Sequence, residues 1–135
     1  MPFTYSIDLP NNLIRQQLWG RITTVDLREI ASMMWRDPQY RKKLHILADM
    51  RDAQADVSYE EMLEYTHFLS GKSDIGRQAI VVSRQLEFGM ARMYQQVTEH
   101  NVLRADLRVF LDMKAAEEWI LSKPDQRSEP SEQDS

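Results

Sequence analysis

The spacing of apolar side chains changes along the chain and predicts a different element at each place. Residues 3–8 alternate apolar and polar side chains, which is typical of a strand with one solvated face. Residues 79–82 are Ala-Ile-Val-Val without polar alternation, which indicates a strand buried on both faces in the middle of a sheet. Apolar residues then recur at helical spacing over 86–97. The chain is therefore predicted to be organised around a strand–helix unit at 78–97.

The remaining elements complete an α/β pattern. Further strands are predicted at residues 3–8, 13–20, 44–48 and 107–111. The first two should form a hairpin, because Leu9–Asn12 has turn chemistry. Helices are predicted to begin near Thr24, Ser58, Leu86 and Asp112. The order β-β-α-β-α-β-α-β-α predicts a mainly parallel five-stranded sheet with about four helices, in which a strand leaves the sheet at the charged residues 49–52.

Length and composition indicate one domain. The chain has 135 residues, 42% of them hydrophobic, which is enough for a single core. That domain is predicted over residues 1–122. Residues 123–135 contain no large apolar side chain, so a disordered polar tail is expected there.

Charge and the absence of cysteine restrict the functional classes. The net charge of −4 argues against a nucleic-acid-binding domain, which usually needs a basic surface. Without cysteine, the chain can form neither disulfides nor zinc–thiolate sites. Its first residues lack a basic leader and no apolar run approaches bilayer length, so a cytoplasmic protein without a membrane span is expected.

The candidate catalytic and metal-binding motifs are all incomplete. Gly71-Lys72-Ser73 resembles the end of a phosphate-binding loop, but Thr66 stands where that loop needs glycine. Ser83 lacks the flanking glycines of a nucleophile elbow and is better interpreted as a helix-capping residue. The histidines are far apart in sequence, at His45, His67 and His100. We therefore expect a protein without enzymatic activity, metal or cofactor.

One surface remains as a candidate binding site. In open α/β sheets, ligands and partners tend to meet the carboxyl ends of the parallel strands. Polar residues follow two predicted strands, at 49–52 and 83–85. We call the candidate surface the carboxyl-end rim; its residues are Asp49, Arg51, Asp52, Ser83, Arg84, Phe88 and Met90. Arginines, carboxylates and a helix start could bind a small anion or an acidic partner, although Arg51 and Asp52 could instead simply pair and cap.

With these elements placed, the chain resembles the SpoIIAA-like proteins, which are related to STAS and SEC14-type domains. The segments that carry the resemblance are 20–27 (GRITTVDL), 47–53 (LADMRDA), 79–83 (AIVVS), 88–94 (FGMARMY), 109–110 (VF) and 115–120 (AAEEWI). They span nearly everything before the tail. The resemblance implies the same single-domain α/β fold.

The resemblance also implies two kinds of function. STAS domains are typically regulatory modules, switched by phosphorylation of a serine that follows the aspartate at the end of the third strand. Asp49 matches that aspartate, but no hydroxyl follows before Ser58, so this switch is not expected here. The SEC14-like relation implies a lipid or other apolar ligand, for which this short chain suggests a small crevice. Its predicted lining is Phe88, Met90, Trp35 and Tyr94.

Two functional hypotheses follow. The first is a non-enzymatic STAS-like signalling module that binds a protein partner through the carboxyl-end rim. The alternative is a domain that binds a small molecule or lipid in an apolar crevice. An apolar cavity would favour the alternative, whereas a filled core with an exposed rim would favour the first. Sheet edges and an exposed helix face could also support a homodimer.

Overall fold

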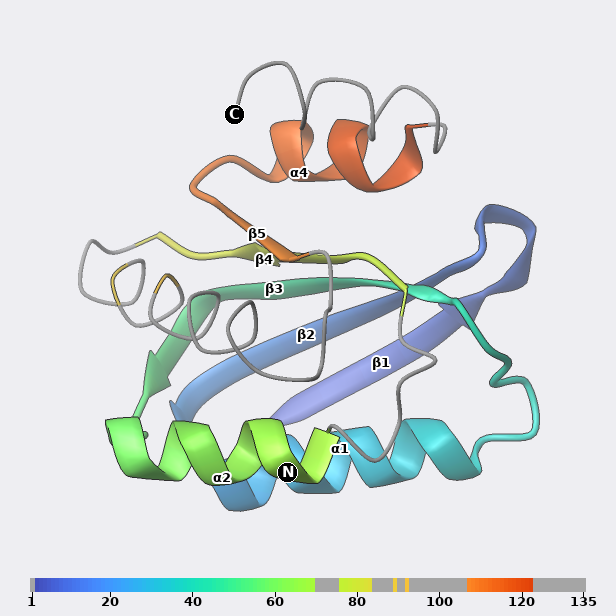
Figure 1. Cartoon of the computed structure of the whole chain (residues 1–135). Helices are drawn as coiled ribbons and strands as arrows, with labels where there is room; N and C mark the ends of the chain where they lie inside the picture. Colours follow the sequence, from blue (N-terminus) through green and yellow to red (C-terminus); the bar gives the residue numbers. More distant parts are fainter. Residues whose placement is uncertain (1, 70–75, 84–88, 90–91, 93–106, 123–135) are drawn as a thin grey trace.

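The protein has a mixed five-stranded sheet in a computed structural model that describes residues 2–69, 76–83, 89, 92 and 107–122 (Figure 1). The strands are β1 (Phe3–Asp8), β2 (Leu13–Ile22), β3 (His45–Ala55), β4 (Gln78–Val81) and β5 (Leu107–Phe110). They lie side by side in chain order. β1 pairs antiparallel with β2, and the other neighbouring pairs are parallel. The predicted hairpin and mainly parallel sheet are confirmed.

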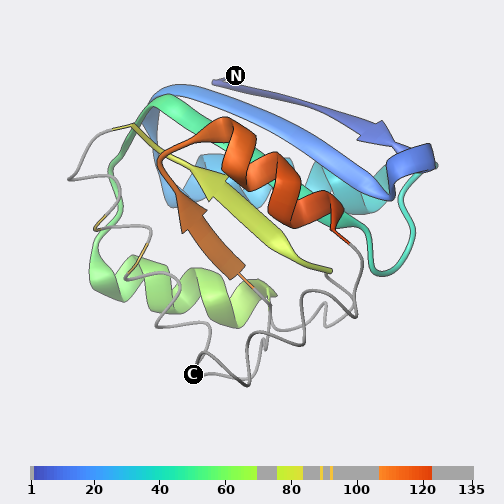
Figure 2. The same ribbon diagram turned by 90° about the horizontal axis from the view of Figure 1, so that it is seen from above.

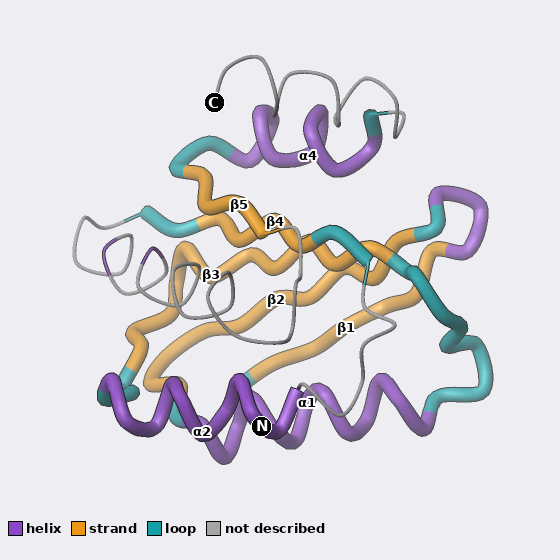
Figure 3. The backbone as a smooth tube through the Cα atoms, viewed as in Figure 1, coloured by secondary structure: helices purple, strands orange, loops and turns teal. Residues whose placement is uncertain are grey.

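Helices cover both faces of this sheet. On one face lie α1 (Thr24–Arg36) and α2 (Tyr59–Leu69), and on the other lies α4 (Met113–Leu121) (Figures 1 and 2). The 3-10 turn η1 (Leu9–Asn11) joins β1 to β2. Figure 3 shows the sheet as the middle of three layers. The described residues contain three α-helices; the additional helix predicted at 86–97 falls almost entirely outside them, and the tail at 123–135 falls outside them altogether.

Capping side chains fix where the helices begin. α2 starts with a capping box: the Glu61 amide donates to Ser58 Oγ at 3.1 Å, and the Ser58 amide donates to the Glu61 carboxylate at 2.9 Å. Thr23 and Asp112 cap α1 and α4 in the same way, through side-chain oxygens that accept backbone N–H bonds. α1 ends at Arg36, shortly before Pro38, because the residue before a proline is disfavoured in a helical conformation. No helix in the described ranges is long and apolar enough to cross a membrane.

β4 contributes to both apolar layers. Ala79 and Val81 pack with Ile120 beneath α4, whereas Ile80 and Val82 pack in the layer beneath α1 and α2. All four β4 side chains are buried, which confirms the prediction from the Ala-Ile-Val-Val run. The strand is interior but not central, because β3 holds the middle of the sheet and only β5 lies beyond β4.

The prediction that a strand leaves the sheet at 49–52 is wrong. β3 continues to Ala55, which lies opposite Ile22 in β2. β2 also continues beyond its predicted end at Gly20, with a register shift between Gln17 and Trp19. β2 and β3 therefore stay paired past the point where β4 ends. The charged residues at 49–52 remain part of β3 because its backbone stays paired with β2.

Candidate functional site

An apolar cavity of about 120 Å³ lies between the sheet and the helices α1 and α2. Its lining comes from five elements and from the segments that follow β3 and β4, so it is formed by the fold and not by one loop. The described residues that line it are Gln16, Leu18, Ile22, Leu27, Ile30, Ala31, Met34, Trp35, Ile46, Ala48, Met50, Ala55, Val57, Met62, Tyr65, Gln78, Ala79, Ile80 and Val82.

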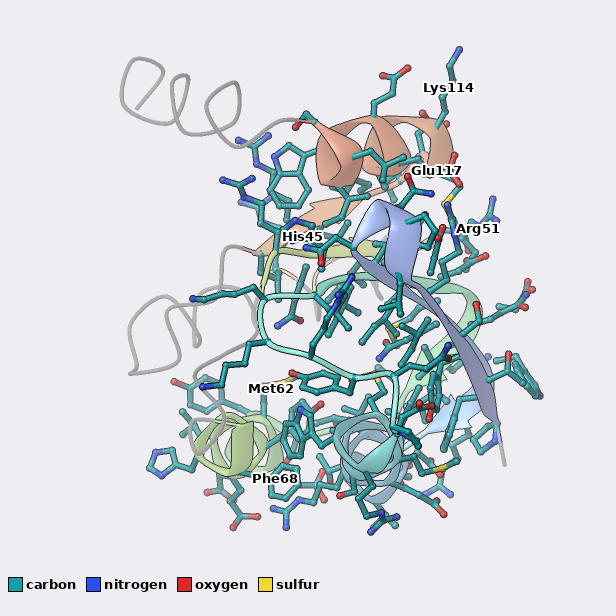
Figure 4. The ribbon with its side chains drawn as sticks, turned by 90° about the vertical axis from the view of Figure 1, so that its right-hand side faces the viewer. His45, Arg51, Met62, Phe68, Lys114 and Glu117 are labelled. Carbon is teal, nitrogen blue, oxygen red and sulfur yellow. The ribbon has the colours of Figure 1, made fainter. Side chains whose placement is uncertain are left out.

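Strand alternation and small side chains leave this space open. Gln16, Ala48 and Ile80 are opposite one another on β2, β3 and β4 and all contribute to the lining. From the helical side, Ala31 on α1 and Met62 on α2 face the same space. Figure 4 shows Met62 reaching from α2 towards the sheet. Because alanines stand at positions on both the sheet and α1, the two layers do not fill the volume between them.

Three aromatic side chains of α1 and α2 pack together on the helical side of the cavity. The Trp35 and Phe68 rings lie 5.6 Å apart between centroids, and the Tyr65 and Phe68 rings 6.2 Å apart. Phe68 lies between α2 and α1 (Figure 4), with the Arg28 guanidinium 5.1 Å from its ring centroid. Of the predicted crevice residues, Trp35 lines the cavity, whereas Phe88, Met90 and Tyr94 lie outside the described residues.

The polar groups on the cavity wall are uncharged. Burial raises the pKa of the Tyr65 phenol, which therefore stays protonated near neutral pH. Gln16 Nε2 donates to Met34 Sδ at 2.9 Å. Gln78 is 7% exposed and is the buried polar residue at the start of β4. The described lining residues thus present a mainly apolar surface with neutral hydrogen-bonding groups.

The structure brings part of the carboxyl-end rim together on the α4 side of the sheet. Arg51 Nε and Nη2 donate to the two carboxylate oxygens of Asp49, each at 2.9 Å. Ser83 Oγ donates to the Arg51 carbonyl oxygen at 2.8 Å and so ties the end of β4 to β3. Asp52 lies opposite Trp19 in β2. The helix-capping interpretation of Ser83 is not tested, because residues 84–88 are not described, and Arg84, Phe88 and Met90 also lie outside the described residues.

The alternative pairing proposed for Arg51 is partly right. Arg51 does form an ion pair within the rim, but its partner is Asp49 two residues before it and not Asp52 after it. Alternation along β3 explains this, because residues two apart lie on the same face of a strand. The hydrogen bonds from Arg51 hold the pKa of the Asp49 carboxyl below its usual range, and the Asp49 carboxylate raises the pKa of Arg51.

A polar hollow of about 420 Å³ lies beside α4 and was not predicted from the sequence. It is lined by Thr4, Tyr5, Ser6, Arg15, Gln16, Gln17, Leu47, Asp49, Arg51, Met113 and Glu117. Arg15 Nη1 lies 3.3 Å from Glu117 Oε2 and links β2 to α4. Arg51 and Glu117 lie on the same side of the sheet (Figure 4). The available signal was the pair of polar residues Arg15 and Gln17 on one face of the second strand.

The Arg51–Asp49 pair should make part of the stability acid-sensitive. Because the fold lowers the pKa of Asp49, the contribution is complete above its unfolded value of about 3.9 and is lost as the pH falls through the lowered pKa. Arg51→Ala should reduce this component while lowering the unfolding free energy at neutral pH by less than about 1 kcal/mol, since the Arg51 side chain is 44% exposed.

Urea unfolding measured from neutral to strongly acidic pH tests this prediction. Arg15→Ala is the matched control, because it removes an arginine from an ion pair on the same face without touching Asp49. The acid dependence that Asp49 contributes should persist in full in Arg15→Ala and become smaller in Arg51→Ala, which keeps only the backbone N–H bond of residue 51 to Asp49. Equal acid dependence in wild type and Arg51→Ala would contradict the assignment.

Comparison with known proteins places this architecture in a family. A sequence model of the SpoIIAA-like family matches residues 13–121, which is most of the chain. A solved structure from Shewanella loihica PV-4, an uncharacterized protein of the DUF3478 family with a SpoIIAA-like fold, superposes with a TM-score of 0.60 at 14% identity. The superposition covers 87% of this chain and 93% of that one. No match was found among proteins of curated function. The chain belongs to the SpoIIAA-like family, as its sequence resemblance predicted.

Proposed function

We propose that this domain binds a small, mainly apolar molecule in the cavity between the sheet, α1 and α2, without converting it chemically. The observation that carries the proposal is the cavity of about 120 Å³ with its largely apolar lining. Engineered apolar cavities of about 150 Å³ stay dry and bind benzene or xenon. A cavity of this size and lining therefore favours a ligand over water.

The volume restricts the size of the ligand. A single ring or a short branched chain fits about 120 Å³, whereas a complete acyl chain does not. The most efficient small ligands gain at most about 1.5 kcal/mol per heavy atom, so a ligand of about six heavy atoms should have a micromolar to millimolar dissociation constant. Binding experiments must therefore reach millimolar ligand concentrations.

The polar groups of the carboxyl-end rim support binding without catalysis. The Ser83 hydroxyl donates to a backbone carbonyl, and the Asp49 carboxylate accepts three hydrogen bonds from Arg51, one from its backbone N–H and two from its guanidinium. A serine nucleophile needs a neighbouring base that takes its proton, and a general base needs a free oxygen within reach of a substrate. In the described arrangement the Ser83 hydroxyl and the Asp49 carboxylate are both engaged by Arg51 instead.

Filling the cavity should abolish binding. Ala31 is buried on α1 and lines the cavity, so the larger side chain of Ala31→Leu would occupy ligand space. We expect the affinity for toluene, followed by two-dimensional NMR titration, to fall at least about tenfold, because lost contact and overlap remove more than about 1.4 kcal/mol.

Val25→Leu is the matched control for this filling variant. Val25 lies on the same helix but is 71% exposed, so an added methylene there does not reach the cavity. Val25→Leu should bind toluene as wild type does. The proposal fails if toluene causes no saturable shifts in the wild type, or if Ala31→Leu binds it equally well.

A second candidate function is capture of a protein partner through the carboxyl-end rim. The observation that favours it is the half-exposed Arg51 guanidinium, held in place by Asp49 beside the Ser83 hydroxyl. Met50 lies between Asp49 and Arg51 and lines the cavity, so ligand and partner would act on one segment of β3. Arg51→Ala separates the candidates: it should weaken partner capture in a pull-down and leave toluene binding unchanged.

A further inference from the structure

The cavity wall contains one polar side chain at the head of an apolar strand. Gln78 begins β4 between Ile46 of β3 and Leu107 of β5, and the rest of its strand is apolar. It is 7% exposed, and it lines the cavity. Its amide therefore offers a hydrogen-bonding group to whatever occupies the cavity.

Such an amide has a strong demand for a partner. The side chain offers two donors and one acceptor, and a ligand that covers it without making a bond costs free energy that a leucine or methionine at this position would avoid. A ligand with a hydrogen-bonding group can recover this cost when it enters the cavity, because its polar atom replaces the water that the amide lost. The glutamine thus favours a ligand that carries a hydrogen-bonding group over one that is apolar throughout.

The other polar groups of the cavity determine the charge of that ligand. The Gln16 amide already donates to Met34 Sδ, and Tyr65 stays a neutral phenol. No acid or base that is charged at neutral pH occurs among the described lining residues. A buried ionic group would therefore meet no opposite charge there, and its desolvation would prevent binding.

We infer that the cavity selects a neutral molecule with an apolar body and one hydroxyl, carbonyl or amide group, which the Gln78 side chain recognises. This inference rests on the proposed function, because it names the ligand class of the same cavity. Alcohols, phenols, ketones and primary amides of single-ring size belong to this class. Carboxylates such as fatty-acid anions do not.

Toluene and phenol form a matched ligand pair for the test. They have nearly the same size and differ in a methyl or hydroxyl group, and phenol is neutral at pH 7. Their dissociation constants are measured by NMR titration for wild type and Gln78→Met. The ratio of phenol affinity to toluene affinity should fall about tenfold in Gln78→Met, the loss expected for one hydrogen bond. An unchanged ratio would overturn the inference.

Gln16→Met is the matched control on the neighbouring strand. Its amide already has a partner, so the affinity ratio should change less than about threefold. Benzoate tests the charge requirement: at pH 7 it should bind at least about tenfold more weakly than phenol, and equal affinity would contradict the inference. If toluene itself does not bind to wild type, the proposed function fails; if toluene binds but the ratio does not depend on Gln78, only the present inference fails.

A measurement on the native protein covers the case in which Gln78→Met does not fold. The side-chain NH₂ resonances of Gln78 should shift on saturation with phenol and move much less with toluene. Shifts of equal size with both ligands would show that the amide does not recognise the hydroxyl.

Discussion

Gly76→Ala is expected to lower the free energy of unfolding by about 3 kcal/mol, within the range of overpacked and backbone-strained substitutions. A Cβ atom at this position would lie 2.7 Å from the Lys43 carbonyl oxygen, 2.8 Å from the Leu44 carbonyl oxygen and 2.8 Å from His45 Nδ1. Two of these atoms belong to the backbone, which cannot move without disturbing β3. The contact also lies where β3 and β4 begin to pair.

Three hydrogen bonds hold this junction and would be disturbed together. The Gly76 amide donates to the Leu44 carbonyl at 3.1 Å, the Arg77 amide to His45 Nδ1 at 2.9 Å, and the Ile46 amide to the Arg77 carbonyl at 2.8 Å. They align the first residues of β4 with β3. Relieving the clash would therefore shift the end of the β3–β4 pair at which the register of the two strands is set.

Urea denaturation of Gly76→Ala and Gly20→Ala measures the effect against a control. Gly20 has a positive φ of 72°, but an added Cβ would meet no atom within 4 Å. Gly20→Ala should therefore lose only about 1 kcal/mol, the cost of a left-handed conformation. A loss for Gly76→Ala no greater than for Gly20→Ala would show that the close approach is relieved without cost.

Met62→Ala is the second substitution with a large expected effect. Met62 is buried on α2 and lines the cavity, so removing its side chain both loses apolar contact and enlarges the cavity. Substitutions of this type cost about 2–5 kcal/mol, and we expect about 3 kcal/mol. Thermal and urea unfolding of the variant measure the loss.

A ligand should restore part of the stability lost in Met62→Ala. At a free concentration ten times its dissociation constant, a ligand that binds only the folded state adds about 1.4 kcal/mol. Met113→Ala is the control, because Met113 is the first residue of α4 and packs on the opposite face of the sheet. Toluene should stabilise both wild type and Met62→Ala. It should stabilise Met113→Ala no more than it stabilises wild type. Absence of any toluene effect on Met62→Ala would contradict the position of the binding site.

The fold was largely predictable because its signals are local. Alternation over 3–8 indicated an edge strand, the Ala-Ile-Val-Val run indicated an interior strand, and the capping box of Ser58 and Glu61 marked a helix start. The strand end at 49–52 was predicted wrongly because charge density was interpreted as an exit from the sheet. α4 packs mainly against β3, β4 and β5, and Arg51 and Asp52 are exposed on the paired strand β3. A strand can therefore carry charged residues while it stays paired.

The site was predicted only in part. Asp49, Arg51 and Ser83 do lie together, as expected for residues at neighbouring strand ends. A small apolar crevice was expected from the resemblance, and Trp35 lines the cavity that is found. The cavity's position and volume were not predictable, since they depend on how far α1 and α2 lie from the sheet. Two sequence features were informative in retrospect: a glutamine, Gln78, at the head of an otherwise apolar buried strand, and the small side chain of Ala48 within another.

Xenon binding tests the central claim, the ligand-accessible cavity, most directly. Crystals of the wild-type protein and of Ala31→Leu are exposed to xenon under pressure, because xenon enters apolar cavities of this size without needing a polar contact. The proposed site predicts xenon between α1 and β3, beside Ala31 and Ala48, in wild type and not in Ala31→Leu. Wild-type crystals without xenon at that position would contradict the proposal.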